Sequence, residues 1–151
     1  MLKQWARERP DVDVSPMAMI GRLFRVARRI EARLGENFAA QGIDAATFDV
    51  LATLRRSGAP YALSPKDLVG TSMVTSSAIA QRLNKLEAEG LIELTSNQHD
   101  SRGKLVHLTD TGRTIIDSVL PNHVAVEHAF LQALSSEQQD ALAALLTALD
   151  H

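Results

Sequence analysis

Two helix signals stand close together in the middle of the chain, and no other feature constrains the fold as strongly. Ser64 at an N-cap position, followed by Pro65, predicts the start of a first helix. That helix must be short, because Gly70-Thr71-Ser72 interrupts it. A second helix is predicted to begin at Thr75 and to end at Gly90, a residue type common at the left-handed position after a helix. Two such helices joined by a tight turn form a helix-turn-helix.

Two β-prone stretches follow this pair of helices directly, at residues 91–95 and 104–109. The polar segment 96–103 between them predicts a hairpin with a long tip. A helix-turn-helix followed by a projecting hairpin has the element order of a winged helix. We therefore predict a winged helix-turn-helix lobe over residues 44–109, with Asp44 as the N-cap of its first helix.

Long helices are predicted on both sides of the lobe. Apolar residues recur at gaps of three and four along residues 17–41, which indicates one amphipathic helix. Residues 111–151 are also predicted to be helical, with a cap at Thr109 or Asp110, a kink or break at Pro121 and a capping box over residues 135–138. The predicted fold is mainly α with a small β hairpin.

The apolar stripes of the flanking helices exceed what a small winged helix can cover, and this favours a homodimer. We assign residues 17–41 and 111–151 as dimerisation helices within a single domain that spans residues 1–151. This length fits one compact domain. The first sixteen residues are polar and carry no signal-peptide pattern, so we expect a frayed tail and a cytoplasmic protein.

Composition excludes several classes of function. The chain has no cysteine, which removes disulfides, thiolate metal sites and thiol catalysis. Its five histidines show no metal-ligand spacing, and Ser76-Ser77 lacks the Gly-x-Ser-x-Gly context of a serine nucleophile. We therefore expect no enzyme, no metal and no cofactor. The net charge of −2 does not by itself indicate nucleic-acid binding.

The second helix of the pair nevertheless carries a polar outer face. Placing its apolar stripe inward turns Gln81 and Lys85 outward, and Ser77 lies on the same face with Ser76 at its edge. Hydroxyls at a helix start can contact phosphate, and Gln81, Arg82 and Lys85 have the donors that read a major groove. The alternative is that all of these are ordinary polar surface residues.

The hairpin tip decides between these alternatives. It carries Arg102 and Lys104 beside the second helix, and Asp100 is placed to hold the arginine for entry into a minor groove. A winged-helix adaptor that binds another protein would not need these two cations at an exposed tip, but it remains the alternative function.

At this point the sequence resembles the MarR family of bacterial transcriptional regulators. The resemblance rests on LSPKDLVGTSMVTSSAIAQRLNKLEAEGLIE and on DSRGKLVHLTDTG, which begin at Leu63 and Asp100. It implies an obligate homodimer whose two winged-helix lobes straddle a pseudo-palindromic DNA operator. The positions that match the family's DNA-contacting residues are Thr75, Ser76, Ser77, Gln81, Arg82, Lys85, Asp100, Arg102 and Lys104.

A narrower resemblance is to the branch that contains PecS-type and urate-responsive regulators. It implies an effector site for an anionic purine, with Trp5, Arg9 and Asp49 at the matching positions. An indole stacks, an arginine pairs with an anion and a carboxylate accepts ring N–H groups. Leu94 stands where some urate-responsive members have a basic residue, so a phenolic or another purine-like anion fits as well. Alternatively, Trp5 packs the N-terminal segment onto the dimer and Asp49 forms a salt bridge.

Overall fold

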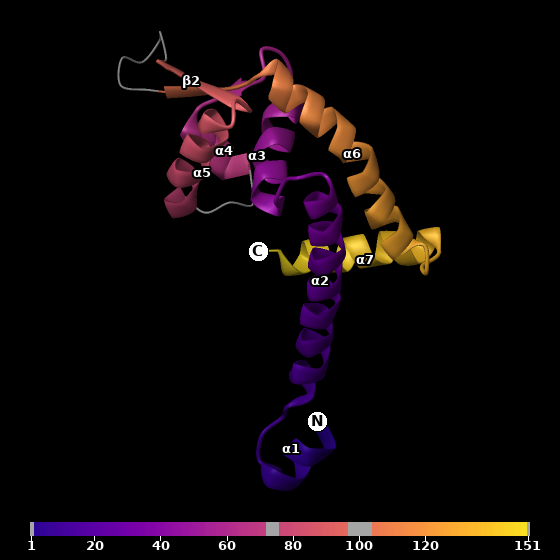
Figure 1. Cartoon of the computed structure of the whole chain (residues 1–151). Coiled ribbons are helices and arrows are strands. Elements are labelled where there is room, and N and C mark those ends of the chain that lie inside the picture. Colours follow the sequence, from indigo (N-terminus) through magenta and orange to yellow (C-terminus); the bar gives the residue numbers. More distant parts are fainter. Residues whose placement is uncertain (1, 72–75, 97–103, 151) are drawn as a thin grey trace.

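A computed structural model describes residues 2–71, 76–96 and 104–150. These residues form seven helices and three short strands, drawn in Figure 1. In chain order the elements are α1 Leu2–Glu8, α2 Ser15–Ala40, α3 Ala45–Arg56, β1 Ala62–Leu63, α4 Pro65–Thr71, α5 Ser76–Ala88, β2 Ile92–Ser96, β3 Lys104–Leu108, α6 Asp110–Leu131 and α7 Ser136–Leu149. The prediction of a mainly helical chain with a small β element is confirmed.

The lobe at the centre of the sequence contains the predicted helix-turn-helix as α4 and α5. Strands β2 and β3 pair antiparallel from Ile92 opposite Leu108 to Ser96 opposite Lys104, which gives the predicted hairpin. The sheet has a third strand that the sequence analysis missed, because β1 pairs with β3 and the strand order is β1-β3-β2. Strand β1 has two residues, too few to show the alternation by which a strand is recognised.

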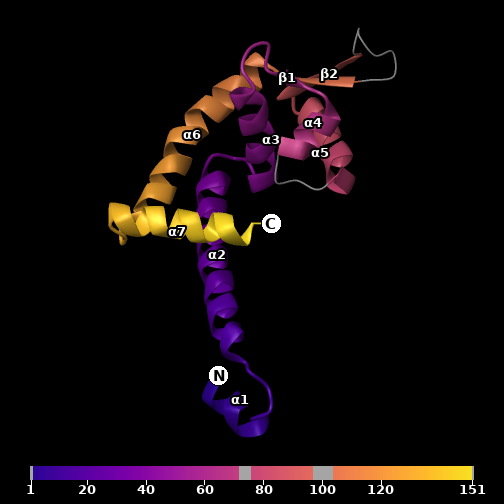
Figure 2. The same cartoon turned by 180° about the vertical axis from the view of Figure 1, so that it is seen from behind.

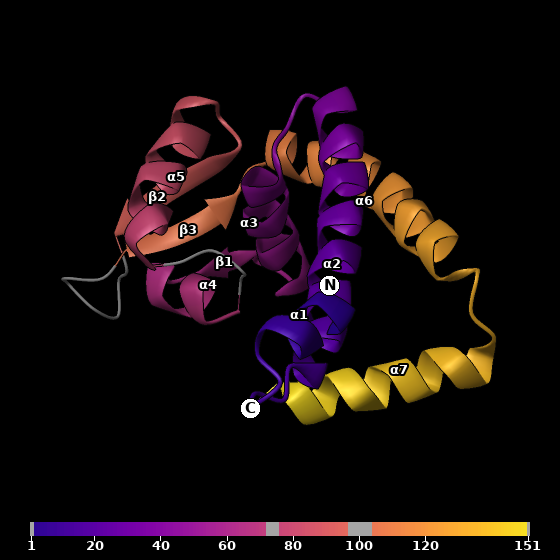
Figure 3. The ribbon, with the colours of Figure 1, turned by 90° about the horizontal axis from the view of Figure 1, so that it is seen from below.

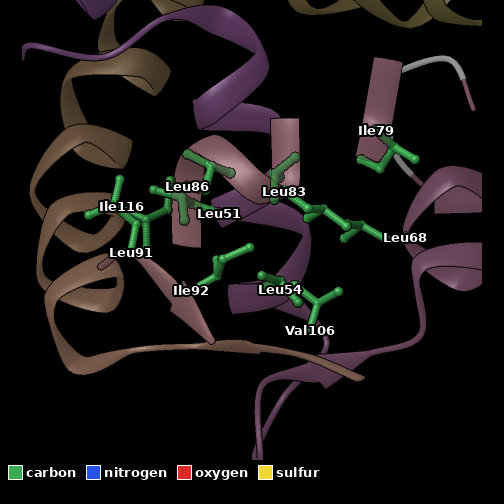
Figure 4. Close-up of a cluster of buried hydrophobic side chains, with 11 residues drawn as sticks. Leu51, Leu54, Leu68, Ile79, Leu83, Leu86, Leu91, Ile92, Val106 and Ile116 are labelled. Carbon is green, nitrogen blue, oxygen red and sulfur yellow. The ribbon is translucent and has the colours of Figure 1, made fainter. Parts of the chain in front are cut away.

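Apolar side chains from α3, α4, α5, the sheet and α6 meet in one core (Figure 4). The stripe predicted for the second helix of the pair is buried in it. The core consists of Val50, Leu51, Leu54, Leu68, Ile79, Leu83, Leu86, Leu91, Ile92, Val106 and Ile116. This burial fixes which side of α5 faces solvent.

The predicted helix caps are present. The Thr47 N–H donates to the Asp44 carboxylate at 2.7 Å, and the Gly112 N–H donates to the Thr109 hydroxyl at 3.0 Å. Ser135 starts α7 with a complete capping box. Gly90 has a φ of +70°, the left-handed conformation expected after the end of α5.

One local prediction is wrong, and one of two predicted alternatives is excluded. The N-terminal tail, expected to fray, contains helix α1, and the Arg9 N–H donates to the Trp5 carbonyl at its end. Of the kink or break predicted at Pro121, the break is absent, because α6 runs from Asp110 to Leu131 as one element. Packing holds the helix on both sides of the proline. Val119 is buried before it, and the His123 ring after it packs against Phe38 of α2 and Phe48 of α3.

The flanking helices lie outside the lobe. Helix α2 extends away from α3 and carries α1 at its far end, and α6 leads from the sheet to α7 (Figures 1 and 2). Seen from below, α7 stays clear of α4, α5 and the sheet (Figure 3). Neither α1 nor α7 has a buried residue, and only Phe38 is buried on α2. Much of their apolar surface is therefore exposed within the described residues of one chain.

Gly112 in the first turn of α6 offers a test of how tightly the sheet and α6 pack. A Cβ there would overlap the Leu91 carbonyl oxygen and lie 2.9 Å from a methyl carbon of Leu108. We expect Gly112→Ala to lower the free energy of unfolding by about 2–3 kcal/mol in urea titrations. Gly35→Ala on α2 is the matched control, because nothing lies within 4 Å of its added Cβ. The control should be neutral or stabilising by about 0.5–1 kcal/mol. Equal behaviour of the two variants would contradict the close packing.

Candidate nucleic-acid interface and effector site

The exposed side of α5 carries the candidate DNA-reading residues. Because Ile79, Leu83 and Leu86 are buried, Gln81 and Lys85 lie on the solvent side of the helix, and both are exposed. Ser76 and Ser77 lie in the first turn of α5, and Thr75 lies outside the described residues. Arg82 is the remaining predicted DNA contact on α5, and its environment differs from that of Gln81 and Lys85.

Arg82 turns toward the start of α3. Its Nη1 atom lies 2.6 Å from Oδ2 of Asp44, and the Nζ atom of Lys85 lies 3.7 Å from the same oxygen. Partial burial raises the pKa of Asp44, but hydrogen bonds from the Thr47 N–H and from Arg82 outweigh it and lower that pKa to about 2. From the sequence, Asp44 is predicted only as a helix cap. Its second role joins two helices through residues 38 positions apart in the chain, and no local pattern signals such a contact.

The β2–β3 hairpin projects from the lobe beside α5 (Figure 1). Lys104 begins β3 and is exposed, whereas Asp100 and Arg102 lie outside the described residues. The hairpin is tied to α5, because the Leu94 N–H on β2 donates to Glu87 Oε1 at 3.2 Å. The base of the hairpin is therefore in direct contact with α5.

The three residues assigned to an effector do not meet within one chain. Trp5 lies on α1 with 40% of its surface exposed, and the guanidinium of Arg9 pairs with Asp11 at 2.7 Å. The hydrogen bond from Arg9 lowers the pKa of Asp11 below its usual range. Asp49 is partly buried on α3, and α3 lies near the opposite end of α2 from α1 (Figure 1).

A cavity of about 500 Å³ lies between α3 and α6. Its lining is Phe48, Ala52, Arg55, Arg56, Ile116, Asp117, Leu120, His123, Val124 and Glu127, and it includes none of the three assigned effector residues. At one end the His123 ring packs on Phe48, with ring centroids 4.3 Å apart. The wall is largely apolar, and its two arginines are balanced by Asp117 and Glu127, with Arg55 paired to Asp117 at 2.8 Å. Such a lining suits a small, largely apolar molecule. The sequence does not predict this cavity, because its walls come from helices far apart in the chain.

The described residues contain neither a candidate metal site nor a membrane-spanning helix. Among them, no group of three or more histidine, aspartate and glutamate side chains is placed to hold a metal ion. Within the same ranges, no helix is long and apolar enough to cross a membrane.

The helix-turn-helix, the projecting hairpin and the flanking helices define a winged helix-turn-helix protein. A family model described as "MarR family" matches residues 41–103. PecS of Dickeya dadantii, an HTH-type transcriptional regulator, is 41% identical over 146 residues, which cover 97% of this chain and 88% of PecS. This chain belongs to the MarR family. The members of that family are transcriptional regulators and not enzymes.

Solved structures agree with this assignment. A mutant of Escherichia coli MarR, complexed with operator DNA, is similar with a TM-score of 0.78 and 26% identity, over 91% of this chain and 99% of MarR. BpsR of Bordetella bronchiseptica is similar with a TM-score of 0.77 and 25% identity, over 85% of this chain and 89% of BpsR. The BpsR structure concerns the regulation of its DNA binding by 6-hydroxynicotinic acid.

Proposed function

We propose that this protein is a homodimeric, sequence-specific DNA-binding repressor that a small anionic aromatic or purine-like molecule releases from a pseudo-palindromic operator. The observation that carries this proposal is the exposed polar side of α5 next to the projecting hairpin. Both belong to a lobe that resembles a MarR protein solved with operator DNA. The alternative is a winged-helix adaptor that binds a protein and no specific DNA.

In the proposed complex, α5 enters the major groove. Gln81 reads base edges and Lys85 contacts phosphate, while Thr75, Ser76 and Ser77 at the helix start bind phosphate oxygens. Arg102 enters the adjacent minor groove, with Asp100 and Lys104 at the same hairpin. The cations at the protein surface contribute affinity, and the contacts of Gln81 contribute sequence preference.

The exposed apolar faces support the homodimer. Phe24 on α2 is 57% exposed and Leu145 on α7 is 65% exposed. Further large apolar side chains on the same helices are exposed, namely Met17, Met19, Ile20, Leu23, Leu142, Leu146 and Leu149. A second copy that covers these faces would also provide two lobes, which must lie about 34–36 Å apart to reach successive major grooves.

Substitutions at α5 and at the hairpin test DNA recognition. We expect Gln81→Ala to weaken operator binding by about 1–3 kcal/mol and to relax the preference at one base pair. Arg102→Ala should weaken binding by about 1–3 kcal/mol without dissociating the dimer. The measurement is a gel-shift titration, with competitor DNA and at two salt concentrations, on an operator selected from random-sequence DNA. Lys3→Gln on α1 is the control and should bind like the wild type.

Two results would count against this model. Wild-type binding that competitor DNA erases for every selected sequence would favour the adaptor. An unchanged affinity of the Arg102→Ala variant would remove the hairpin from the DNA contact.

The leucine face of α7 tests the dimer. Leu145→Glu places a charge on that face, and we expect the protein to sediment as a monomer in analytical ultracentrifugation. Ala144→Glu puts the same charge on the opposite side of α7 and should leave the dimer intact. A dimeric Leu145→Glu variant would show that this face is not the interface.

The effector proposal combines the residues of two chains. Since Trp5 and Arg9 lie at the other end of α2 from Asp49, a shared site needs the N-terminal segment of one subunit near α3 of its partner. The regulation of BpsR by an aromatic acid supports a ligand of this class. Binding there would shift the lobes away from the separation that fits two major grooves.

Variants of the assigned site test this placement. We expect Trp5→Ala and Asp49→Ala to bind the operator like the wild type. Each should need at least about tenfold more ligand for release, because a stacking or charge-assisted contact is lost. The ligands to use are 6-hydroxynicotinic acid, salicylate and urate, in the same gel-shift titration. Arg56→Gln is the comparison variant. An effect of Arg56→Gln alone would place the ligand in the cavity between α3 and α6 instead.

A further inference from the structure

The carboxylate of Asp44 contacts two helices with its two oxygen atoms. Oδ1 accepts a hydrogen bond from the Thr47 N–H at 2.7 Å, which caps α3. Oδ2 lies 2.6 Å from the guanidinium of Arg82 on α5. We propose that Asp44 is a positioning residue for DNA recognition, which sets the orientation of α5 relative to the junction between α2 and α3. This inference rests on the DNA-binding function proposed above.

Asp44 lies where the long helix α2 joins the lobe. Helix α2 ends at Ala40, and the backbone N–H of Ile43 returns to the Phe38 carbonyl at 3.1 Å. Only residues 41–44 separate α2 from α3, so the position of Asp44 follows the end of α2 closely. A contact from Asp44 to α5 therefore links α2 to the helix proposed to read DNA.

Side-chain packing leaves a space at this junction. A cleft of about 270 Å³ lies between residues 41–44 and α5, with Thr47, Lys85, Glu89, Leu91 and Ile115 in its remaining lining. Asp44 is part of this lining, and its ion pair with Arg82 joins the junction to α5. Because the apolar core does not fill the space, the polar contact contributes to the spacing of α5 from the junction.

Arg82 is placed to act through Asp44 and not on DNA directly. It follows Gln81 and precedes the buried Leu83, at the edge between the exposed and the buried side of α5. Its side chain is 23% exposed, compared with 53% for Lys85. Its charge already has a partner at hydrogen-bond distance, whereas the ammonium group of Lys85 has only longer contacts, 3.7 Å to the same oxygen and 3.8 Å to Oε1 of Glu89.

Asp44→Asn is the informative substitution. Asparagine is as good an N-cap as aspartate, so α3 keeps its cap while Arg82 loses its ionic partner. Arg82→Gln breaks the same pair from the other side. We expect each variant to bind the selected operator about five- to tenfold more weakly, and the double variant to bind no more weakly than either single variant.

The salt dependence of operator binding distinguishes a positioning role of Arg82 from a direct contact of Arg82 with DNA. If Arg82 acts by positioning, the slope of log affinity against log salt concentration stays that of the wild type in both variants. Lys85→Gln is the matched control, and it should lower that slope by about one because it removes a phosphate contact. Tighter operator binding by Asp44→Asn would overturn the proposal, because Asp44 would then compete with DNA for Arg82. The proposal would also be overturned if Arg82→Gln lowered the slope by about one and if the affinity losses of Asp44→Asn and Arg82→Gln added in the double variant.

Amide hydrogen exchange of the free protein provides a readout without DNA. We expect faster exchange along α5 in Asp44→Asn, with exchange along α3 unchanged. Unchanged exchange along α5 would reject the positioning role, whatever the DNA results. If the wild type binds no selected DNA, the proposed function fails, but the exchange experiment still decides whether Asp44 holds α5.

Discussion

The packing of α3 is the interaction on which the rest of the structure depends. Val50, Leu51 and Leu54 are fully buried, and α3 contacts α4, α5 and β3 on one side and α2 and α6 on the other. No other described element joins the lobe to both flanking helices in this way. The orientation of the lobe relative to α2 and α6 is therefore set by the apolar surface of one twelve-residue helix.

The same core defines the surface that faces DNA in the proposed function. Burial of one stripe of α5 leaves the polar stripe exposed, and the hydrogen bond from Leu94 to Glu87 holds the hairpin beside it. The ion pair between Asp44 and Arg82 then connects α5 to the end of α2. Recognition residues, hairpin and flanking helix are thus joined by a few polar contacts around an apolar core.

Much of this could be predicted from local signals. The caps at Asp44, Thr109 and Ser135 and the left-handed Gly90 each depend on a few adjacent residues, and all are present. The differences between prediction and structure have physical causes. Strand β1 is too short for a pattern, and α6 continues through Pro121 because packing on both sides of the proline holds the helix together.

The sequence by itself determined the order of helices α2 to α7 and of the hairpin strands, the buried stripe of α5, the outward position of Gln81 and Lys85, and the family. These follow from periodicity and short motifs, which are properties of neighbouring residues. Only the tertiary structure decided that Arg82 pairs with Asp44, that α1, which carries Trp5, lies far from α3, which carries Asp49, and that a cavity lies between α3 and α6. Such relations join residues that are distant in the chain, and they depend on how the helices pack in space rather than on the sequence near each residue.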